Sequence, residues 1–153
     1  MSRAFVKDAE DDGGDDLPDR PISPHPNYVT ARGMAQIDGE LARLTAALAA
    51  TPADDRAANN SLHRDLRYWR ARRATAEVIE PPPETGKVHF GSTVTIRRKD
   101  GRTQTWQIVG EDEADPDKGT IPYVAPLAKA LMGKEVGDEV RAGETAAEIL
   151  SIK

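Results

Sequence analysis

Cysteine is absent from this chain of 153 residues, and aromatic residues make up only 5% of it. The absence of cysteine excludes disulfide frameworks, thiol nucleophiles and every zinc site that uses Cys ligands. With few aromatic side chains and a mean hydropathy of −0.61, the core is expected to be modest and built mainly from Val, Ile, Leu and Ala. Apolar runs long enough to cross a membrane are also missing, and the N-terminus lacks the apolar core of a signal peptide. We therefore expect a cytoplasmic protein with no membrane partner.

The net charge of −5 is unevenly distributed along the chain. Acidic residues dominate the segment up to Asp19, whereas one later segment is rich in arginine: Arg64, Arg67, Arg70, Arg72 and Arg73. A protein that binds free duplex DNA is expected to carry a basic surface overall. Free duplex DNA is therefore not an expected partner.

Residues 1–27 are predicted to form a disordered arm. Acids crowd the stretch from Asp8 to Asp19, and prolines are frequent from Leu17 to Pro26. Such a segment cannot bury enough apolar surface to offset the entropy lost on ordering. Two roles stay open for the arm: a solubilising tail, or an acidic segment that contacts a basic partner surface.

Residues 28–80 are predicted to form an antiparallel coiled-coil hairpin. The first helix is expected to follow Thr30, a suitable N-cap. Its apolar residues recur at alternating spacings of three and four: Met34, Ile37, Leu41, Leu44 and Leu48. The same spacing continues later in the chain through Leu62, Leu66, Trp69, Arg73 and Ala76.

The turn of the hairpin is expected at Thr51. Thr51 has the character of an N-cap for the second helix, with Pro52 in the first helical position and Asp54 in an approximate capping box. Folding about this turn pairs the two apolar stripes as Leu41 with Leu62, Ile37 with Leu66 and Met34 with Trp69. Arg73 falls on the same seam, and the hairpin ends near Ile79.

After a proline-rich linker at residues 81–85, the pattern changes to short alternating runs. Strands are expected at Lys87–Phe90, Thr93–Arg98, Thr103–Val109 and Ala146–Ile152, with a tight turn at Asp100-Gly101. One short helix is expected at Pro126–Met132, stopped by Gly133. Residues 86–153 thus read as a small antiparallel sheet packed by one helix, and the whole chain belongs to the α+β class.

Residues that would carry intrinsic catalysis or hold a metal are not evident. His25, His63 and His89 are far apart and lack acids at ligand spacing. The acidic run Glu111–Asp117 lacks the spacing of a calcium-binding loop and is interpreted as a solvated turn or a partner contact. We expect neither enzyme activity nor a bound cofactor.

Three stretches resemble the C-terminal domain of the bacterial Gre transcript-cleavage and elongation factors (GreA/GreB) in residue type, order and spacing: Phe90–Ile96, Trp106–Gly110 and Pro126–Asp138. Tyr28-Val29-Thr30 with Gly33, and Arg64–Ile79, resemble the hairpin helices of the same family. The resemblance implies an FKBP-like C-terminal domain that docks on RNA polymerase and a coiled coil that enters its secondary channel. Within the docking motif, the matching residues are Pro126, Lys129, Gly133, Lys134 and Asp138. Ala125 stands where the family commonly has Ser, so helix capping there is expected to be weaker.

Acids at the family's hairpin tip help the polymerase hold a magnesium ion that cleaves the 3′ end of a backtracked transcript. Asp54 and Asp55 occupy the corresponding region here, and an alternative role for them is to stabilise the start of a helix. Arg56, Arg64, Arg67 and Arg70 are candidates to contact the nascent RNA or the channel, or else form a solvated helix face.

Three functional hypotheses follow. The first is a Gre-type, polymerase-binding elongation factor that acts on backtracked complexes through the secondary channel. The second is a regulator that binds polymerase without stimulating cleavage and competes with full-length Gre factors, since each hairpin arm is about ten residues shorter than in the family, or roughly 15 Å of helix. The third, a prolyl isomerase or chaperone, rests on the shared fold alone.

Overall fold

The computed structural model describes residues 17–84, 86–143 and 145–153. The predicted disorder of residues 1–16 lies outside the described residues. The chain divides into two compact units. The hairpin unit contains Gln36–Thr75 and the described residues up to Pro24, and the sheet unit contains His25–Ala35 and the described residues from Ala76 onward. The start of the first helix, which the sequence placed with the hairpin, therefore belongs to the sheet unit.

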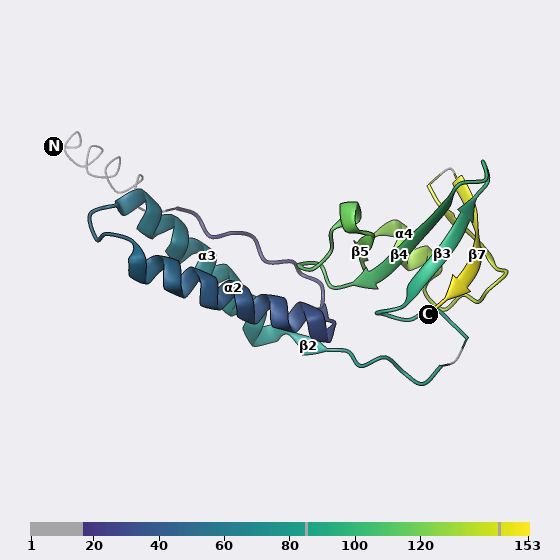
Figure 1. The fold of residues 1–153 in the computed structure, drawn as a ribbon, viewed down its shortest axis with the longest axis horizontal. Coiled ribbons are helices and arrows are strands. Elements are labelled where there is room, and N and C mark those ends of the chain that lie inside the picture. The colour runs from purple at the N-terminus through teal and green to yellow at the C-terminus, as the bar shows by residue number, and fades with distance from the viewer. Residues whose placement is uncertain (1–16, 85, 144) are drawn as a thin grey trace. The chain divides into compact units, whose positions relative to one another are not determined.

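Two long helices form most of the hairpin unit, α2 at Ala31–Ala50 and α3 at Arg56–Thr75 (Figure 1). The predicted apolar stripe is confirmed by burial, because Ile37, Leu44 and Leu66 are each 1% exposed. The remaining apolar residues of the stripe that lie in these helices are half-buried: Met34, Leu41, Leu48, Leu62 and Trp69. The spacing of apolar residues thus identified the inward face of α2. In α3 the buried residues are Leu66 and Arg72, and Arg72 lies off the predicted stripe.

The predicted start of the second helix, with Thr51 as its cap and Pro52 as its first residue, is wrong by four residues. α3 begins at Arg56, and Asp55 is its cap, because the Asp55 carboxylate accepts a hydrogen bond from the Ala58 backbone N–H at 3.2 Å. Thr51 instead donates its hydroxyl to the Ala47 carbonyl at 2.7 Å and so closes the end of α2. The Asp55 backbone N–H binds the Pro52 carbonyl, which turns the chain before α3 can begin.

Arg73 does not occupy the seam between the helices. Its side chain is 48% exposed, and its Nε donates to Asp38 of α2 at 2.7 Å. The predicted pairing of individual apolar residues across the hairpin stays a prediction.

Residues 17–24 form neither a helix nor a strand, and their side chains contact α3. Asp19 accepts a hydrogen bond from Arg67 at 2.6 Å, and Arg20 lies over the Tyr68 ring. The prolines at positions 18, 21 and 24 restrict the backbone of this stretch, which lowers the entropy lost when it is ordered.

The sheet unit contains a five-stranded sheet in the order β5-β4-β3-β7-β6. Its strands are β3 at Thr93–Arg98, β4 at Thr103–Val109, β5 at Thr120–Pro122, β6 at Glu139–Ala142 and β7 at Thr145–Ile152. The prediction of a wholly antiparallel sheet is wrong, because β5 pairs with β4 in parallel. The chain leaves β4, passes through the short 3-10 helix η1 at Pro116–Lys118, and returns beside β4 in the same direction.

The central strands β3 and β4 begin and end where the alternation of apolar residues predicted. Their turn contains Gly101 at φ 92°, a conformation that glycine adopts readily. The Arg102 backbone N–H, together with the Arg102 guanidinium, binds the Asp100 carboxylate and holds the pKa of that carboxyl below its ordinary value. The predicted strand at Lys87–Phe90 is not formed. Instead the Val88 backbone exchanges hydrogen bonds with the Gly133 N–H and the Lys134 carbonyl.

A second, two-stranded parallel sheet joins β1 at Tyr28–Val29 to β2 at Glu77–Val78. The helix that was expected to continue to Ile79 therefore ends at Thr75, because the following residues pair with β1. The Glu77 N–H donates to the buried Asn27 carbonyl and the Ile79 N–H to the Val29 carbonyl.

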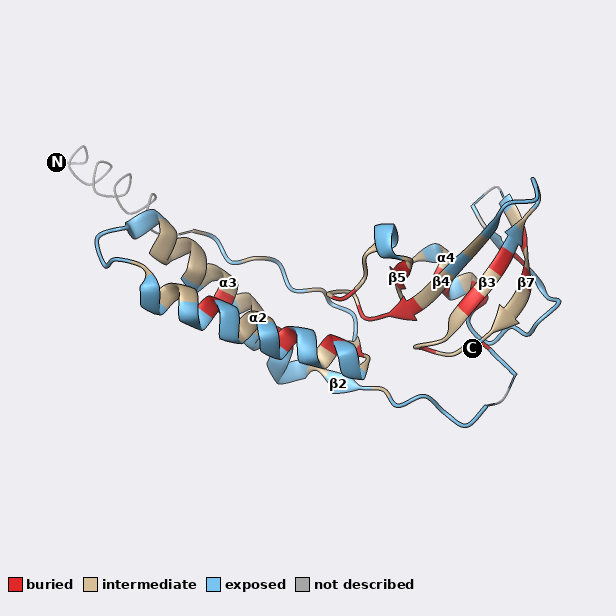
Figure 2. Ribbon diagram, viewed as in Figure 1, coloured by how far each residue is buried: buried red, intermediate tan, exposed pale blue. Residues whose placement is uncertain are grey.

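The core of the sheet unit lies between the five-stranded sheet and α4 at Pro126–Leu131 (Figure 2). Fully buried side chains come from both layers: Val94, Ile96, Ile108, Ala128, Leu131 and Ile149. At one end, Tyr28, Phe90 and Tyr123 pack ring against ring with centroids 5.4–6.2 Å apart. As expected, Ala125 precedes α4 without a side-chain capping bond. No helix in the described part of the chain is long and apolar enough to cross a membrane.

Replacing Asp55 tests the cap of α3. The Asp55→Ala variant should lower the free energy of unfolding by about 0.5–2 kcal/mol, because the Ala58 N–H loses its acceptor. Asp55→Asn should cost only a few tenths of a kcal/mol, since Asn caps helices as well as Asp does. Urea unfolding followed by far-UV circular dichroism provides the measurement. Asp54→Ala is the control, and an equal loss in that variant would contradict the assignment of Asp55 as the cap.

Candidate functional site

α4 and the turn after it present a mixed basic and apolar surface. Pro126, Lys129 and Lys134 are exposed, as the docking prediction requires, and Met132 between the lysines is 38% exposed. We call these four residues the α4 face. A hollow of about 360 Å³ that includes Lys129, Met132 and Lys134 also has Arg141 of β6 in its lining.

Two of the predicted docking residues, Gly133 and Asp138, are exposed and also shape the turn that follows α4. Gly133 adopts φ 79°, and its N–H donates to the Val88 carbonyl. The Asp138 carboxylate accepts a hydrogen bond from the Glu135 N–H at 2.8 Å, which closes the turn that leads into β6. Substitutions at Gly133 or Asp138 would therefore act through the shape of this turn.

The four candidate arginines for RNA or channel contact lie on one side of α3. The spacing of Arg56, Arg64, Arg67 and Arg70 places them within about a 120° arc of the helix, and we call this side the arginine face. Three of the four are exposed, whereas Arg64 is half-buried. The Arg64 Nε lies 3.5 Å from an Asp65 carboxylate oxygen. The four arginines therefore share one side of α3, and their contact with RNA or the channel stays a prediction.

The tip of the hairpin carries the two candidate acids. Asp55 is committed to capping α3, and Asp54 beside it is exposed. Within residues 17–84, 86–143 and 145–153, no cluster of three or more His or acidic side chains is placed to hold a metal ion. Mg²⁺ prefers six oxygen ligands, so this pair can at most add carboxylate oxygens to an ion held elsewhere.

A buried carboxylate that the sequence reading missed ties the start of α2 to the end of β4. The Glu113 side chain is 2% exposed and accepts hydrogen bonds from the Thr30 N–H at 2.9 Å, the Thr30 hydroxyl at 2.6 Å and the Gly110 N–H at 3.2 Å. The Thr30 hydroxyl also accepts the Gly33 N–H, as the predicted N-cap of α2 should. The acidic run was interpreted as a solvated turn or partner contact, which is wrong for Glu113.

The space for Glu113 depends on two glycines. A Cβ at Gly33 would overlap the Glu113 carboxylate, and a Cβ at Gly110 would overlap the Tyr28 carbonyl oxygen. These glycines are the one sequence signal that could have pointed to a close approach between the two segments. The residues that an added Cβ would overlap at these two glycines lie more than seventy positions away along the chain. Local periodicity of the sequence therefore could not predict these contacts.

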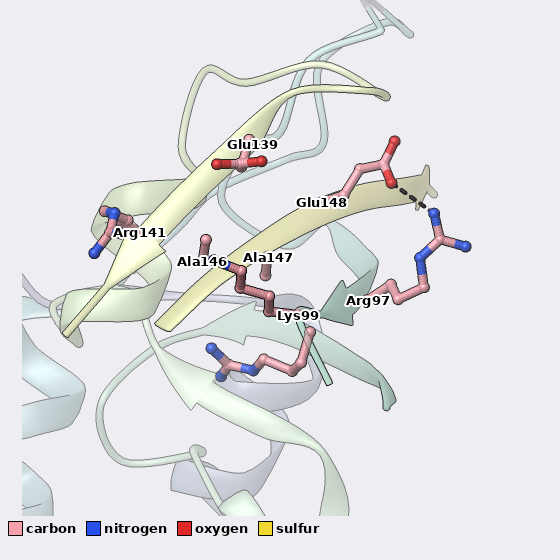
Figure 3. Close-up of a pocket in the computed structure, with 8 residues that line it drawn as sticks. Arg97, Lys99, Glu139, Arg141, Ala146, Ala147 and Glu148 are labelled. Atoms are coloured by element: carbon pink, nitrogen blue, oxygen red, sulfur yellow. Dashed lines mark hydrogen bonds and ion pairs between the residues drawn. The ribbon is translucent and has the colours of Figure 1, made fainter. Parts of the chain in front are cut away.

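A second basic surface lies on β3, β6 and β7 at the turn ends of their hairpins (Figure 3). A hollow of about 270 Å³ is lined by Arg97, Arg98, Lys99 and Arg141, and Glu139 and Glu148 also line it. Arg97 binds Glu148 at 2.7 Å, and Arg98 donates to Gln104 at 2.9 Å, so part of the basic charge is already engaged. The pairing of β3 and β6 with β7 brings these residues together, and the sequence analysis did not predict this cluster.

Comparison with known proteins finds a family match in the second part of the chain. Residues 82–153 match the family described as Transcription elongation factor, GreA/GreB, C-term. This matched region is just under half of the chain, and over it the chain is similar to that family. The matched region includes the α4 face and the basic hollow of Figure 3, whereas the arginine face and the tip acids lie outside it.

Curated relatives agree with the family match. The transcription elongation factor GreA of Ruegeria pomeroyi is 43% identical over 83 residues, which cover 51% of this chain and 53% of the relative. GreA of Desulfovibrio desulfuricans is 44% identical over 77 residues, covering 49% and 48%, and GreA of Hyphomonas neptunium is 47% identical over 85 residues, covering 52% and 54%. The matched segment spans about half the length of these relatives.

Solved structures with some likeness include GreA factor homolog 1 (Gfh1) of Thermus thermophilus, with a TM-score of 0.42, 19% identity and coverage of 84% of this chain and 99% of that one. The GreA/GreB protein of Nitrosomonas europaea has a TM-score of 0.41 and 22% identity, covering 82% and 98%. At these values the likeness carries no conclusion about this chain.

Three glycine-to-alanine variants test the packing around Glu113. Gly110→Ala should lower the free energy of unfolding by about 1–3 kcal/mol, because the added methyl meets a backbone carbonyl that cannot move independently. Gly33→Ala should also destabilise the protein, because the methyl displaces the Glu113 carboxylate from its donors. Gly39→Ala on the same helix, where nothing lies within 4 Å, should raise stability by about 0.5–1 kcal/mol. Thermal unfolding that ranks Gly33→Ala above the wild type would contradict the close approach described here.

Proposed function

We propose that this protein is an RNA polymerase-binding transcription elongation factor of Gre type that is not itself an enzyme. The observation that carries the proposal is the match of residues 82–153 to the GreA/GreB C-terminal domain, within which the α4 face is exposed. The curated relatives are named transcription elongation factors, which supports RNA polymerase as the partner and the cytoplasm as the location.

The α4 face is the proposed docking surface. Met132 supplies exposed apolar area at its centre, and Lys129 and Lys134 flank it with positive charge. Buried apolar anchors provide much of the affinity of an interface, and charges at its rim speed association and select the partner. This surface suits a polymerase segment that combines apolar and acidic residues. Gly133 and Asp138 contribute by fixing the turn that holds Lys134.

The hairpin is the proposed channel element. Its two 20-residue helices with an inward apolar stripe fit a coiled coil, and the sheet with its single α-helix fits an FKBP-like domain. In this proposal the hairpin enters the secondary channel of the polymerase, and the arginine face contacts phosphates of the nascent RNA 3′ end or the channel wall. Asp54 would reach toward the polymerase Mg²⁺ from the tip.

A second candidate function is favoured by the geometry of the tip. Asp55 is used as the cap of α3, which leaves Asp54 as the uncommitted carboxylate of the pair. A single carboxylate is a poor shared ligand for an ion that demands octahedral oxygen coordination. A factor built in this way would bind polymerase without stimulating cleavage and would compete with full-length Gre factors.

Charge reversal on the α4 face tests the docking surface. The Lys129→Glu/Lys134→Glu double variant should bind the cognate polymerase about tenfold or more weakly, because two favourable charges become repulsive. Surface-based binding to immobilised polymerase measures the effect. Lys118→Glu/Lys153→Glu makes the same change in net charge at exposed positions away from this face. Equal losses in the two double variants would show that overall charge, and not the α4 face, determines binding.

RNA cleavage in a stalled, backtracked elongation complex separates the two candidate functions. The Asp54→Asn/Asp55→Asn variant keeps the cap of α3 while it removes both charges, so a loss of activity in this variant cannot come from a frayed helix. If the wild type stimulates cleavage, this variant should lose most of that stimulation. If the wild type is inactive, it should inhibit a full-length Gre factor in a dose-dependent manner. If the wild type neither stimulates cleavage nor inhibits a full-length Gre factor, the secondary channel is excluded as its site of action.

A further inference from the structure

The described N-terminal residues contact α3 through an ion pair and through a guanidinium group that lies over an aromatic ring. We call Leu17–Pro24 the strap. The Arg67 Nε donates to the Asp19 carboxylate at 2.6 Å, so the strap engages the centre of the arginine face. The strap belongs to the same compact unit as α3.

A second anchor of the strap lies one residue further along. The Arg20 guanidinium carbon is 3.9 Å from the centre of the Tyr68 ring and 6.0 Å from that of Trp69, distances at which a cation is attracted to a ring face. Arg20 also lies 3.4 Å from Asp65, which in turn neighbours the Arg64 guanidinium. Adjacent strap residues of opposite charge thus meet complementary groups within about one turn of α3.

The charge of the preceding sequence matches the surface on which the strap lies. Six acids stand immediately upstream of the strap, at Asp8, Glu10, Asp11, Asp12, Asp15 and Asp16. These acids are joined directly to the strap in the sequence, and a covalent link raises the effective concentration of a ligand for a nearby site. On the arginine face, Arg56, Arg67 and Arg70 carry positive charge on exposed side chains.

We propose that the strap is an intramolecular ligand of the arginine face, and that single-stranded RNA must displace it to bind there. The proposal deepens the proposed function, because it rests on the arginine face as a phosphate contact. Asp19 occupies the Arg67 guanidinium that a phosphate would otherwise take, so free protein binds RNA more weakly than its arginines alone would allow. Repetitive prolines keep the strap extended and lower the entropy that it loses when it binds.

Asp19→Asn is the first test, with a fluorescein-labelled single-stranded RNA of about twelve nucleotides as the probe at low salt, about 50 mM. Fluorescence anisotropy should show about two- to fivefold tighter binding than in the wild type, since an exposed ion pair with Arg67 is lost. Asp117→Asn changes net charge equally at an exposed position on η1 and should leave the affinity close to that of the wild type. Equal affinities of the two variants would overturn the proposal.

Arg67→Ala completes a double-mutant cycle. This variant should bind RNA more weakly, and adding Asp19→Asn to it should have no further effect, because the strap then has no guanidinium to release. An undiminished effect of Asp19→Asn in the Arg67→Ala background would show that Asp19 acts through long-range charge and would overturn the proposed competition at Arg67.

Displacement itself can be observed directly because the chain has no cysteine. A nitroxide attached to Ile22→Cys, an exposed strap position, should broaden the amide NMR signals of α3 around Arg67, and added RNA should restore them. Signals that stay broadened while RNA binds would overturn displacement. If the wild type and Asp19→Asn bind RNA equally, the proposed role of the strap is excluded, while the proposed phosphate contact of the arginine face is retained. If no variant binds RNA, both proposals are excluded: the phosphate contact of the arginine face and the competition between the strap and RNA.

Discussion

The Glu113 carboxylate receives the Thr30 N–H, the Thr30 hydroxyl and the Gly110 N–H, and the sheet unit depends on this arrangement. A carboxylate that is 2% exposed is costly unless strong donors replace its water, and these donors come from the start of α2 and the end of β4. Because the Thr30 hydroxyl also accepts the Gly33 N–H, the cap of α2 and the burial of Glu113 form one network. Gly33 and Gly110 provide the close approach that lets β1 run beside this network and pair with β2.

The two units rely on different interactions. The sheet unit has a continuous apolar core in which side chains from the sheet and α4 are fully buried. The hairpin unit buries fewer apolar side chains and carries ion pairs on its surface, including Arg73 with Asp38 and Arg67 with Asp19. Exposed ion pairs are weak and also occur in the sheet unit, as between Arg97 and Glu148, so they do not replace the missing apolar burial. Local opening of the hairpin unit should therefore cost less free energy than opening of the sheet unit. A hairpin that opens locally at lower cost can adjust its shape more easily when it binds a partner.

Elements governed by local sequence could be predicted, and elements governed by distant contacts could not. The apolar alternation of β3 and β4, the stripe of α2 and the Thr30 cap follow from neighbours a few residues away, and all are found in the structure. The start of α3 was misplaced because Thr51 and Asp55 compete for the same role, and hydrogen-bond geometry decides between them. β5, β6 and the parallel β1–β2 pair are short, and their existence depends on long-range register. For the candidate site, the sequence named the arginines of α3 and the two lysines near α4, and their roles stay predictions. The Glu113 network and the strap contacts join residues that are far apart along the chain, so local patterns could not reveal them.

Among the described residues, β5 and β6 are the outer strands of the five-stranded sheet, and each pairs with a strand on one side. β5 is three residues long and ends in Pro122, which has no N–H to offer to an added strand. β6 is four residues long and includes the charged residues Glu139 and Arg141. A strand from another molecule would find few backbone partners at either edge and would have to bury charge at β6. Short, charged or proline-containing edges of this kind resist edge-to-edge aggregation of the sheet.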